Sequence, residues 1–257
     1  MRVLLANAHG GDPAYGGAER YVRDLALGLG RRSHEPVVLS AFPPRAEAGV
    51  ETHVLHAADW RDDRLRRLRN HAGDVASLPW PRLERLLREL RPDLVHTSNL
   101  PGIGTGIWEL ARRLGIPVVH TLHDYHLLCP RTTLTRRDGT ACCASPVFCG
   151  LRARRLARWA PAVRVVVAGS EHLLRVHRTL FSAAETRVVR LPLAPLDGSA
   201  PEPPAAARTL GYLGALTVEK GVRLLLEAAP ALAAGGIELR LAGDGPLRAE
   251  VEAAHVG

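Results

Sequence analysis

The chain has 257 residues, of which 46% are hydrophobic, and its 34 Lys and Arg against 26 Asp and Glu give a formal net charge of +8. This length and composition favour one large or two ordinary globular domains. No apolar run approaches the roughly 20 residues of a membrane helix, and the run Val3–Ala8 is too short for a secretory signal, so we expect a soluble, cytoplasmic protein.

Short β-rich runs alternate with helical runs along the chain. The predicted strands are mostly continuous apolar runs, typical of a parallel sheet covered on both faces: Arg2–Ala6, Pro36–Ser40, Thr52–His56, Leu94–Thr97, Val118–Leu122, Val163–Ala168, Arg187–Leu191, Thr209–Leu213 and Glu238–Ala242. The clearest predicted helices are Gly17–Leu29, Pro81–Leu90, Ile103–Leu114, Glu171–Leu180, Lys220–Leu232 and Pro246–Ala254. This alternation implies right-handed crossovers and an α/β fold with a Rossmann-like, doubly wound parallel sheet.

A segment rich in Pro and Ala, Pro192–Ala207, interrupts this alternation and is unsuited to a central strand. It predicts a linker at 192–207 between a first domain at 1–191 and a second at 208–257. The second part holds only two strand–helix pairs, whereas a complete Rossmann-like sheet needs several. We therefore expect an incomplete second Rossmann-like domain.

The positive charge does not by itself predict a nucleic-acid partner. The arginines are spread over several helical segments and alternate with acidic residues, and aromatic residues make up only 4%. One cluster, Leu151–Trp159, carries four arginines. It fits either a plain surface helix or a peripheral contact with an anionic membrane surface through Leu151, Leu156 and Trp159.

A glycine-rich loop, Asn7–Glu19, follows the first predicted strand and runs into a helix. Gly16 and Gly17 would let backbone amides and the helix dipole approach an anion. The spacing is not that of a Gly-x-Gly-x-x-Gly dinucleotide site, and the glycines can also serve a tight turn alone. Glu19 stands in the first helical turn, where an acidic residue suits the dipole in any case.

The strand Val118–Leu122 leads into a group of histidines and an aspartate at its carboxyl end, where open α/β sheets place their ligands. Alternation puts His120 on the opposite face from Thr121, so His123 at the strand exit is the better candidate. With Asp124 beside it, His123 predicts a functional cleft rather than an ordinary core histidine.

Four cysteines follow in the same long loop: Cys129, Cys142, Cys143 and Cys149. They are too few for a disulfide framework in a chain of this length, and no short Cys-x-x-Cys knuckles are present. Two readings remain: buried free thiols, or a metal site completed by His123 or His126. We expect free thiols and no metal.

Lys220 is the only lysine of the chain and follows the strand that ends near Gly214. A helix predicted to begin near Val218 would place Lys220 in its first turn, where amides and an ammonium converge on a diphosphate. A lysine can also stand there by chance. The strand and glycine turn of Leu239–Pro246 repeat this pattern more weakly.

Taken together, the chain resembles the retaining glycosyltransferases of family 4, which have the two-domain GT-B architecture. The segments that carry the resemblance are Gly16–Glu19, Asp93–His96, His120–Tyr125 with Leu128–Pro130, Glu219–Gly221 and Gly243–Pro246. The resemblance implies transfer of a sugar from a nucleotide-sugar donor to a glycan or lipid-linked acceptor, in the biosynthesis of a cell-envelope polysaccharide. It implies no metal and no other cofactor, because fixed cations and amides stabilise the leaving diphosphate.

The resemblance also assigns roles to single residues. It implies that His123, with Asp124, lies near the transferred sugar. It implies that the donor is bound by Gly16, Gly17, Gly214, Lys220 and Gly221, and the acceptor by Glu19 and Tyr125.

Two departures from the family pattern stand out. Ala215 replaces an arginine that would give the diphosphate a second cation. The family's Glu-x7-Glu motif would lie beyond Gly257, so we expect a truncated or fragmentary form. A non-catalytic acceptor-binding module, and another nucleotide-sugar enzyme such as an epimerase or an inverting transferase, remain as alternatives.

Overall fold

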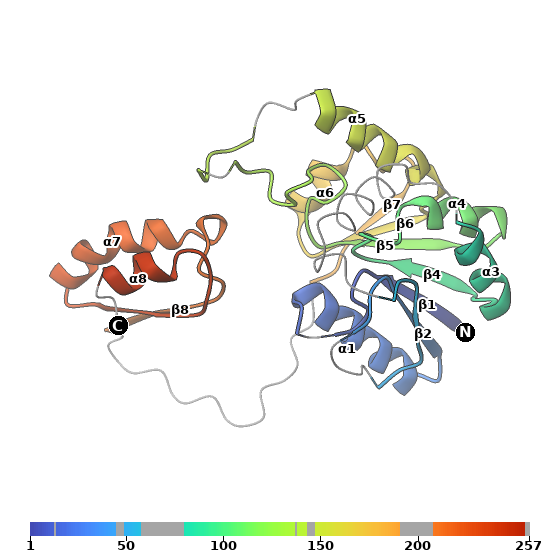
Figure 1. Ribbon diagram of the computed structural model, residues 1–257, viewed down its shortest axis with the longest axis horizontal. Coiled ribbons are helices and arrows are strands. Elements are labelled where there is room, and N and C mark those ends of the chain that lie inside the picture. The colour runs from blue at the N-terminus through green and yellow to red at the C-terminus, as the bar shows by residue number, and fades with distance from the viewer. Residues whose placement is uncertain are drawn as a thin grey trace. The chain divides into compact units, whose positions relative to one another are not determined.

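The computed structural model describes residues 1–12, 14–44, 49–57, 80–136, 138–142, 147–190 and 208–254, and the chain divides into two compact units (Figure 1). The first unit comprises Met1–Thr132 and Ser145–Leu193, and the second comprises Thr133–Ala144 and Ala194–Gly257. The predicted linker 192–207 lies outside the described residues. The domain boundaries at 191 and 208 therefore remain predictions.

The first unit is built on a parallel sheet whose described strands lie in the order β3-β2-β1-β4-β5-β6-β7. Each strand is parallel to its neighbours, and the chain passes outward from central β1 in both directions. This arrangement confirms the predicted α/β, doubly wound Rossmann-like fold. The strands are β1 (Arg2–Asn7), β2 (Glu35–Ser40), β3 (Thr52–Val54), β4 (Leu94–Thr97), β5 (Val118–Leu122), β6 (Val165–Ala168) and β7 (Glu185–Val188).

Helices cover both faces of this sheet (Figure 1). Successive residues of β1 point to opposite faces, so Val3 and Leu5 pack with Val22 of helix α1, whereas Leu4 packs on the other face with Trp108 of helix α4. The helices are α1 (Gly17–Arg31), α3 (Pro81–Leu90), α4 (Gly106–Arg113), α5 (Val147–Leu156) and α6 (Glu171–His177), with a 3-10 helix at Ala157–Ala162.

Local sequence explains where several helices begin and end. Pro81 occupies the start of α3, where its missing amide is not needed, and Arg91 ends that helix in the left-handed conformation. Ser170 caps α6, its Oγ accepting a bond from the Leu173 amide at 3.3 Å. Helix α4 begins later than the predicted Ile103 because residues 101–103 form a turn, in which the amides of Ile103 and Gly104 both donate to the Leu100 carbonyl.

The second unit contains a two-stranded parallel sheet of β8 (Thr209–Leu213) and β9 (Glu238–Ala242), each strand followed by a helix. Helix α7 (Val222–Ala234) and helix α8 (Arg248–Ala253) supply Val222 and Val251 to a small apolar cluster with Leu216 and Leu247. Both strands match their predicted bounds, because each is a short run with large apolar residues at alternate positions between turn residues.

Other predicted bounds were wrong by a few residues. Strand β3 ends at Val54 and not at His56, β6 begins at Val165 because the 3-10 helix runs to Ala162, and β7 spans Glu185–Val188 rather than Arg187–Leu191. Helices α1 and α7 run two residues past their predicted ends, and α6 ends at His177, before the predicted Leu180. Helix α8 is shorter than predicted at both ends.

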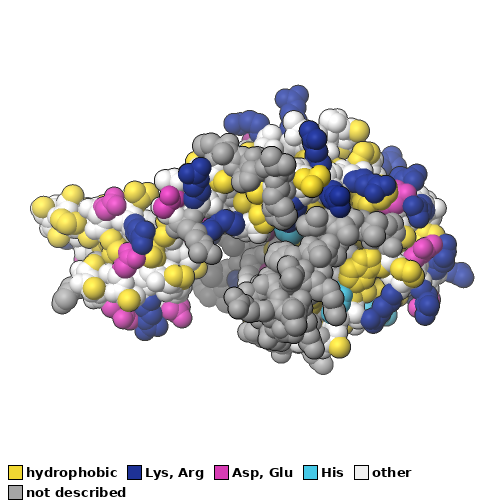
Figure 2. All heavy atoms as spheres, turned by 45° about the horizontal axis from the view of Figure 1, so that its top comes forward, with side chains coloured by type: hydrophobic (Ala, Val, Ile, Leu, Met, Phe, Trp, Pro, Cys, Tyr) yellow, Lys and Arg dark blue, Asp and Glu magenta, His cyan; other side chains and the backbone are white. Residues whose placement is uncertain are grey.

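The arginine-rich cluster 151–159 lies on α5 and the following 3-10 helix, and the predicted membrane face through Leu151, Leu156 and Trp159 is wrong. Leu156 is buried, and Trp159 packs against the core with Arg158 stacked 4.5 Å from its ring centroid. Leu151 alone of the three is exposed, at 52%. Figure 2 shows Lys and Arg side chains spread across the visible surface among acidic and apolar ones.

Candidate functional site

The carboxyl ends of β1, β4 and β5 bring polar residues to one edge of the first sheet. These three strands are adjacent and parallel and end at Asn7, Thr97 and Leu122. The glycine-rich loop leaves this edge after β1, and His123 and Asp124 leave it after β5. The structure therefore places the two predicted motifs at the same edge, as expected for a ligand site in an open α/β sheet.

The loop between β1 and α1 is held by its own buried polar side chains. Asn7 Oδ1 accepts a bond from the His9 amide at 2.9 Å, and Asp12 Oδ1 accepts one from the Ala14 amide at 3.0 Å. Asn7 and Asp12 are fully buried, and the His9 ring stacks on Tyr15 at 3.8 Å between centroids. These contacts fix the path by which the chain reaches Gly16.

The N-terminus of α1 is open. Gly16 and Gly17 are exposed, and Gly16, the N-cap residue, has no side chain with which to cap this helix. A Cβ at Gly17 would meet nothing within 4 Å, and Gly16 is extended at φ 161°, so local packing requires glycine at neither position. The tight-turn explanation is therefore weak for this pair. The small residues leave the first amides of α1, with their positive end of the helix dipole, accessible to an anion.

A compact polar cluster connects α1 to β4 and β5 beside this opening. Thr121 Oγ1 lies 2.7 Å from His96 Nε2 and 3.4 Å from the Tyr21 hydroxyl. The Tyr21 ring meets the His123 ring edge to face, with 5.0 Å between centroids. Thr121 and His96 reach one another because they point to the same face of neighbouring strands.

Burial keeps this cluster uncharged at neutral pH. Burial first, and repulsion from His123 second, lower the pKa of His96 to about 4. Burial lowers the pKa of His123 to about 4, and it raises the pKa of Tyr21 against the opposing effect of the Thr121 hydrogen bond. A neutral imidazole offers one donor and one acceptor. His123 is therefore suited to a sugar hydroxyl rather than to a phosphate charge.

The segment after His123 is fixed by a buried arginine of α5. Asp124 Oδ1 accepts the His126 amide at 2.7 Å, and Arg152 Nη1 donates to the His126 carbonyl at 2.8 Å. Burial raises the pKa of Asp124, although the His126 amide and Arg152 oppose this. Tyr125 turns toward α6, where its ring stacks on His177 at 5.9 Å. Tyr125 and His123 thus contact different partners.

His120 lies in the core, as strand alternation predicted. It is 3% exposed, its Nδ1 lies 2.9 Å from Thr97 Oγ1, and its ring packs against Trp108. Burial lowers the pKa of His120 well below its usual value. Its partners belong to the core, which leaves His123 as the strand-end histidine of the candidate site.

Glu19 is buried in the first turn of α1, at 6% exposure. The ideal Cβ of an alanine at Gly16 would lie 3.3 Å from Glu19 Oε2, so this carboxylate lies directly beside the glycine pair. Its position fits both its predicted acceptor role and a helix-dipole role.

The second unit holds the remaining predicted site residues. Lys220 is exposed, but it is the last residue of a 3-10 helix, Val218–Lys220, and not part of the first turn of α7 as predicted. Gly221 separates the two helices with φ 77°, a conformation that α-helix cannot continue through. The Lys220 amide is bonded to the Thr217 carbonyl at 3.3 Å.

Two glycine turns meet at the carboxyl end of the second sheet. A Cβ at Gly243 would lie 1.8 Å from the carbonyl oxygen of Gly214, so only glycine fits there. The Gly214 amide donates to the Ala242 carbonyl at 3.0 Å, and Tyr212 donates through its hydroxyl to the Ala215 carbonyl at 2.7 Å. A Cβ at Gly214 would lie 3.2 Å from the Tyr212 hydroxyl, so Gly214 has a packing reason in addition to its predicted donor role.

Cys129 and Cys149 are free thiols, Cys129 being buried. Cys149 lies on α5 and not in the long loop as predicted, and Cys143 lies outside the described residues. In the described part of the chain no three His, Cys, Asp or Glu side chains are grouped so as to hold a metal ion. Likewise, none of the described helices is long and apolar enough to cross a membrane.

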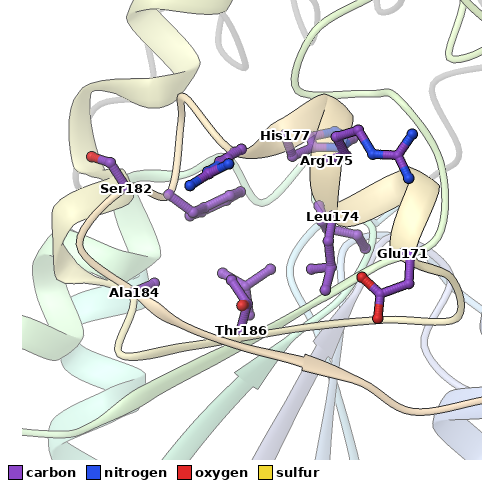
Figure 3. Close-up of a pocket in the computed structure, with 11 residues that line it drawn as sticks. Glu171, Leu174, Arg175, His177, Ser182, Ala184 and Thr186 are labelled. Atoms are coloured by element: carbon purple, nitrogen blue, oxygen red, sulfur yellow. The ribbon is translucent and has the colours of Figure 1, made fainter.

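Two cavities border the β5 exit. A small one of about 10 Å³, roughly the room of one water molecule, is lined by Ser98, Thr121 and His123 among others. A larger one of about 550 Å³ lies under α6 and is lined by residues that include Leu122, His177, Phe181 and Thr186 (Figure 3). No sequence pattern predicted this second cavity.

The sequence patterns did not predict a site role for Tyr21, His96, Thr121 or Arg152. Thr121 and His123 belong to one recognisable motif, and His96 ends another. The contact between Thr121 and His96 depends on the register of β4 against β5, which the sequence does not show. Arg152 breaks the apolar pattern of α5, because it is an arginine at an inward position with 3% exposure. A buried arginine needs a polar partner in the interior, so Arg152 on the inward face of α5 was the one sequence feature that could have indicated such a partner.

Comparison with known proteins agrees with this arrangement. The family model described as Glycosyltransferase Family 4 matches residues 15–194, well over half of the chain. An "uncharacterized 42.6 kDa protein in cps region" of Klebsiella pneumoniae is 25% identical over 245 residues, which cover 86% of this chain and 63% of that protein. The chain thus spans less than two thirds of that relative's length.

Solved structures share the fold at low identity. The catalytic domain of starch synthase IV from Arabidopsis thaliana, bound to ADP and acarbose, superposes with a TM-score of 0.60 at 12% identity, covering 98% of this chain and 71% of that one. An α-glucosyltransferase in complex with UDP and DNA superposes with a TM-score of 0.53 at 12% identity, covering 100% and 61%. Both are GT-B glycosyltransferases. By its family match, this chain belongs to glycosyltransferase family 4.

Proposed function

We propose that the protein transfers a sugar from a nucleotide-sugar donor to a glycan or lipid-linked acceptor with retention of configuration. The observation that carries this proposal is the open N-terminus of α1 beside the neutral His123 at one sheet edge, in a chain of family 4. The name of the Klebsiella relative, which refers to the cps region, supports a cell-envelope polysaccharide as the product.

The donor diphosphate would be bound by backbone amides and one ammonium. In this proposal Gly16 and Gly17 admit a phosphate to the first turn of α1, and Lys220 with Gly214 and Gly221 binds the diphosphate. The exposure of Lys220 and of the glycine pair supports these roles. Departure of a nucleoside diphosphate develops negative charge, and fixed donors stabilise it without reorganisation.

The transferred sugar and the acceptor would be held by the polar residues of the first unit. His123, neutral and partly buried, would bind a sugar hydroxyl, with Asp124 beside it. Glu19 and Tyr125 would bind acceptor hydroxyls. In this proposal residues 1–191 form the acceptor-side domain and residues 208–257 belong to the donor-binding domain.

The test is transfer from a panel of UDP-, GDP- and ADP-sugars to lipid-linked and oligosaccharide acceptors. We expect one donor to be used, with a product linkage of the donor's own anomeric configuration by NMR. His123→Ala should lower kcat at least about a hundredfold, because misplaced groups near the reacting centre cost that much. The control Arg85→Gln changes an exposed residue of α3 and should have no effect.

Each outcome decides between the proposals. Binding of an acceptor without transfer from any donor would favour a non-catalytic acceptor-binding module, and an inverted linkage would contradict the retaining mechanism. Absence of binding for all donors and all acceptors would contradict both.

We also propose a peripheral contact with the cytoplasmic face of a membrane through the outward side of α5. Leu151, Arg154 and Arg155 are exposed and share one face of α5 by their spacing, and Arg158 is exposed on the 3-10 helix that follows. An exposed leucine among three guanidinium groups suits anionic headgroups, at about 1 kcal/mol for each cation near the surface.

Vesicle co-sedimentation tests this contact. The wild type should bind vesicles rich in phosphatidylglycerol and not vesicles of phosphatidylcholine, and Arg154→Gln with Arg155→Gln should weaken binding at least about tenfold. A control that removes two charges from α3, Arg85→Gln with Arg88→Gln, should bind as the wild type does. Equal losses in both double variants would show a general charge effect and contradict the α5 face.

A further inference from the structure

We propose that Tyr21 is the positioning residue of His123: its ring holds the imidazole in one orientation, and its hydroxyl is anchored on Thr121 and His96. This inference rests on the proposed function, in which His123 lies near the transferred sugar. It assigns a role to a side chain of α1 that contacts the candidate site from outside the glycine loop and outside the strand-end motif.

The ring contact is direct and has a defined geometry. The rings of Tyr21 and His123 are 5.0 Å apart between centroids and inclined at 63°. Edge-to-face pairs of this kind restrict both rings, because other inclinations lose the favourable quadrupole contact. His123 Nε2 is buried and has no hydrogen-bond partner among the described residues, so no bond at this atom orients the imidazole, whereas the ring contact with Tyr21 restricts it.

The hydroxyl of Tyr21 is itself held. It lies 3.4 Å from Thr121 Oγ1, which lies 2.7 Å from His96 Nε2, so the three groups form a chain. Each hydroxyl can donate once, from Tyr21 to Thr121 and from Thr121 to His96, or the direction is reversed with His96 donating. In both directions Thr121, which is 1% exposed, connects the tyrosine to the strands.

This connection joins two parts of the proposed site. Tyr21 stands four residues after Gly17 on α1, about one helical turn along the axis. The amides at the N-terminus of α1 and the imidazole at the end of β5 are therefore held in one rigid arrangement through a single side chain. A group aimed at a hydroxyl of the transferred sugar needs such support, since an error of about 1 Å is costly in rate.

In this arrangement the atom of His123 that remains available for a ligand is Nε2. A buried polar atom without a partner is disfavoured, and sites of this kind are commonly completed by a ligand or by water. His123 also borders the small cavity of about 10 Å³, which has room for about one water molecule. Tyr21 would therefore fix the direction in which Nε2 meets a substrate hydroxyl or a bridging water.

The alternative is that Tyr21 only fills space between α1 and the sheet. NMR of the wild type separates the two ideas first. We expect a nuclear Overhauser contact between the ring protons of Tyr21 and the imidazole protons of His123, and a His123 pKa near 4. Absence of that contact would overturn the inference without any variant having to fold.

Two variants then distinguish the role of the Tyr21 ring from that of its hydroxyl. Tyr21→Leu removes the aromatic cover, so the His123 pKa should rise by at least about one unit toward the ordinary value of about 6.5, and kcat should fall at least about tenfold with KM within about threefold. Tyr21→Phe keeps the ring, so the pKa should stay low and kcat should remain within about threefold of the wild type.

The matched control is Leu29→Ala. Leu29 is also a partly buried residue of α1 that packs on the same apolar cluster, and it lies eight residues, about 12 Å, further along the helix. It should lower stability and leave the His123 pKa and kcat unchanged. If Leu29→Ala moves both as much as Tyr21→Leu does, Tyr21 is a packing residue only.

Two further results would overturn the inference. An unchanged His123 spectrum in Tyr21→Leu would do so, and so would a fall in kcat without any change at His123, since Tyr21 would then act on the substrate directly. Failure of sugar transfer in the wild type would contradict the proposed function and leave the NMR result to decide the structural role.

Discussion

At the scale of single residues, the side chains of the candidate site divide by charge. Burial lowers the pKa of both His96 and His123 and keeps them neutral, whereas the Lys220 side chain is exposed. A diphosphate needs cations or amides, and a sugar needs neutral donors and acceptors. This division supports the assignment of Lys220 to the diphosphate and of His123 to the sugar.

Lys220→Ala should weaken the binding of a nucleoside diphosphate at least about tenfold, since a charge-assisted phosphate contact contributes about 1.5–3 kcal/mol. Calorimetry with UDP, GDP and ADP measures this, and Lys220→Arg serves as the control that keeps the charge. Unchanged affinity of Lys220→Ala for all three nucleotides would remove this residue from the site.

The low histidine pKa values predict a loss of stability on acidification. For His96 and His123 the folded-state pKa is about 4, below the ordinary value of 6.5, so the unfolded chain takes up protons first as pH falls. The stability from these neutral histidines is complete above about pH 6.5 and is lost between about pH 6.5 and 4. Each group contributes at most about 3 kcal/mol to this change.

Urea unfolding at pH 7.5, 5.5 and 4.5 measures the effect. His96→Asn keeps a hydrogen-bonding group beside Thr121 without a titrating ring, so its stability should fall less over this range than that of the wild type. The carboxylate of Glu109 titrates lower, because its bonds to Arg112 and then Arg113 lower its pKa to about 2. An equal pH dependence in wild type and His96→Asn would contradict the account.

At the scale of elements, the sequence predicted several strands correctly and missed contacts that depend on register. Leu94–Thr97 and Val118–Leu122 match β4 and β5, because these short runs are rich in apolar and β-branched residues and are bounded by turn residues. The meeting of Tyr21, Thr121 and His96 could not be predicted, since it needs the pairing of β4 with β5 and the docking of α1. The bounds of α5 were missed because Arg152 points inward.

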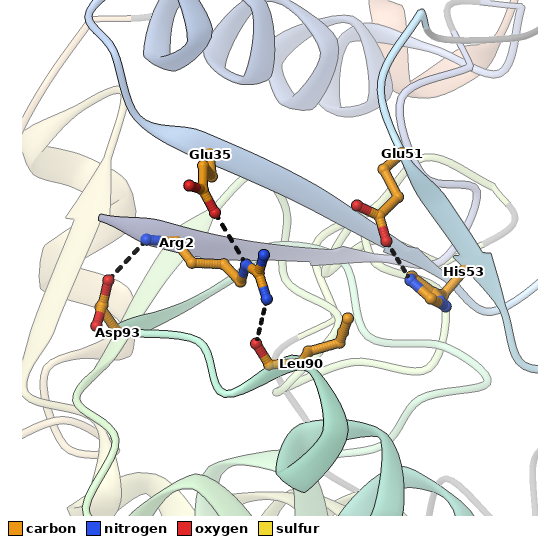
Figure 4. A network of polar contacts seen from close by, with 6 residues as sticks. All are labelled: Arg2, Glu35, Glu51, His53, Leu90 and Asp93. Carbon is orange, nitrogen blue, oxygen red and sulfur yellow. Dashed lines mark hydrogen bonds and ion pairs between the residues drawn. The ribbon is translucent and has the colours of Figure 1, made fainter.

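Asp93, the first residue of the motif Asp93–His96, has a structural role that accounts for its presence. It precedes β4 at the amino edge of the sheet, opposite to the candidate site, and its Oδ2 accepts the Arg2 backbone amide at 2.7 Å (Figure 4). Arg2 also pairs with Glu35 at 3.1 Å and donates to the Leu90 carbonyl at 3.0 Å. These bonds join β1, β2 and the end of α3.

Asp93→Ala should therefore lower the free energy of unfolding by about 1 kcal/mol, the usual contribution of one hydrogen bond, and leave nucleotide affinity within about twofold. Asp93→Asn, which keeps an acceptor oxygen, should unfold nearly as the wild type does. Urea denaturation and calorimetry on the same samples test both parts. A loss of nucleotide affinity with unchanged stability would place Asp93 in the site after all.

At the scale of the whole molecule, the two units differ in how well they cover their apolar residues. The first has an extensive core on both sheet faces. The second has a small cluster, and its large apolar side chains include Leu213 at 88% exposure and Leu224 at 69%. Among the described residues β8 pairs with β9 alone, so its other edge carries unpaired backbone groups.

Exposed apolar side chains beside an open strand edge favour association. We expect the purified protein to bind a hydrophobic dye and to self-associate in sedimentation velocity. Leu213→Ser with Leu224→Ser should reduce both at least about twofold, because it removes the two most exposed leucines of the second unit. Leu27→Ser on α1 is the matched control, and an equal reduction there would contradict the assignment to the second unit.

The central claim is that a nucleotide-sugar binds at the open N-terminus of α1 with its neighbouring His123, and that the turn of the second unit that carries Lys220 also binds a nucleoside diphosphate. The most direct measurement is a backbone and imidazole NMR titration of the isotope-labelled protein with UDP, GDP and ADP and their glucose conjugates. We predict that at least one nucleotide shifts the resonances of Gly16 and Gly17, that its sugar conjugate also shifts those of His123, and that a nucleotide shifts those of Lys220. Binding that leaves all four residues unperturbed, or that perturbs only the cavity under α6, would contradict it.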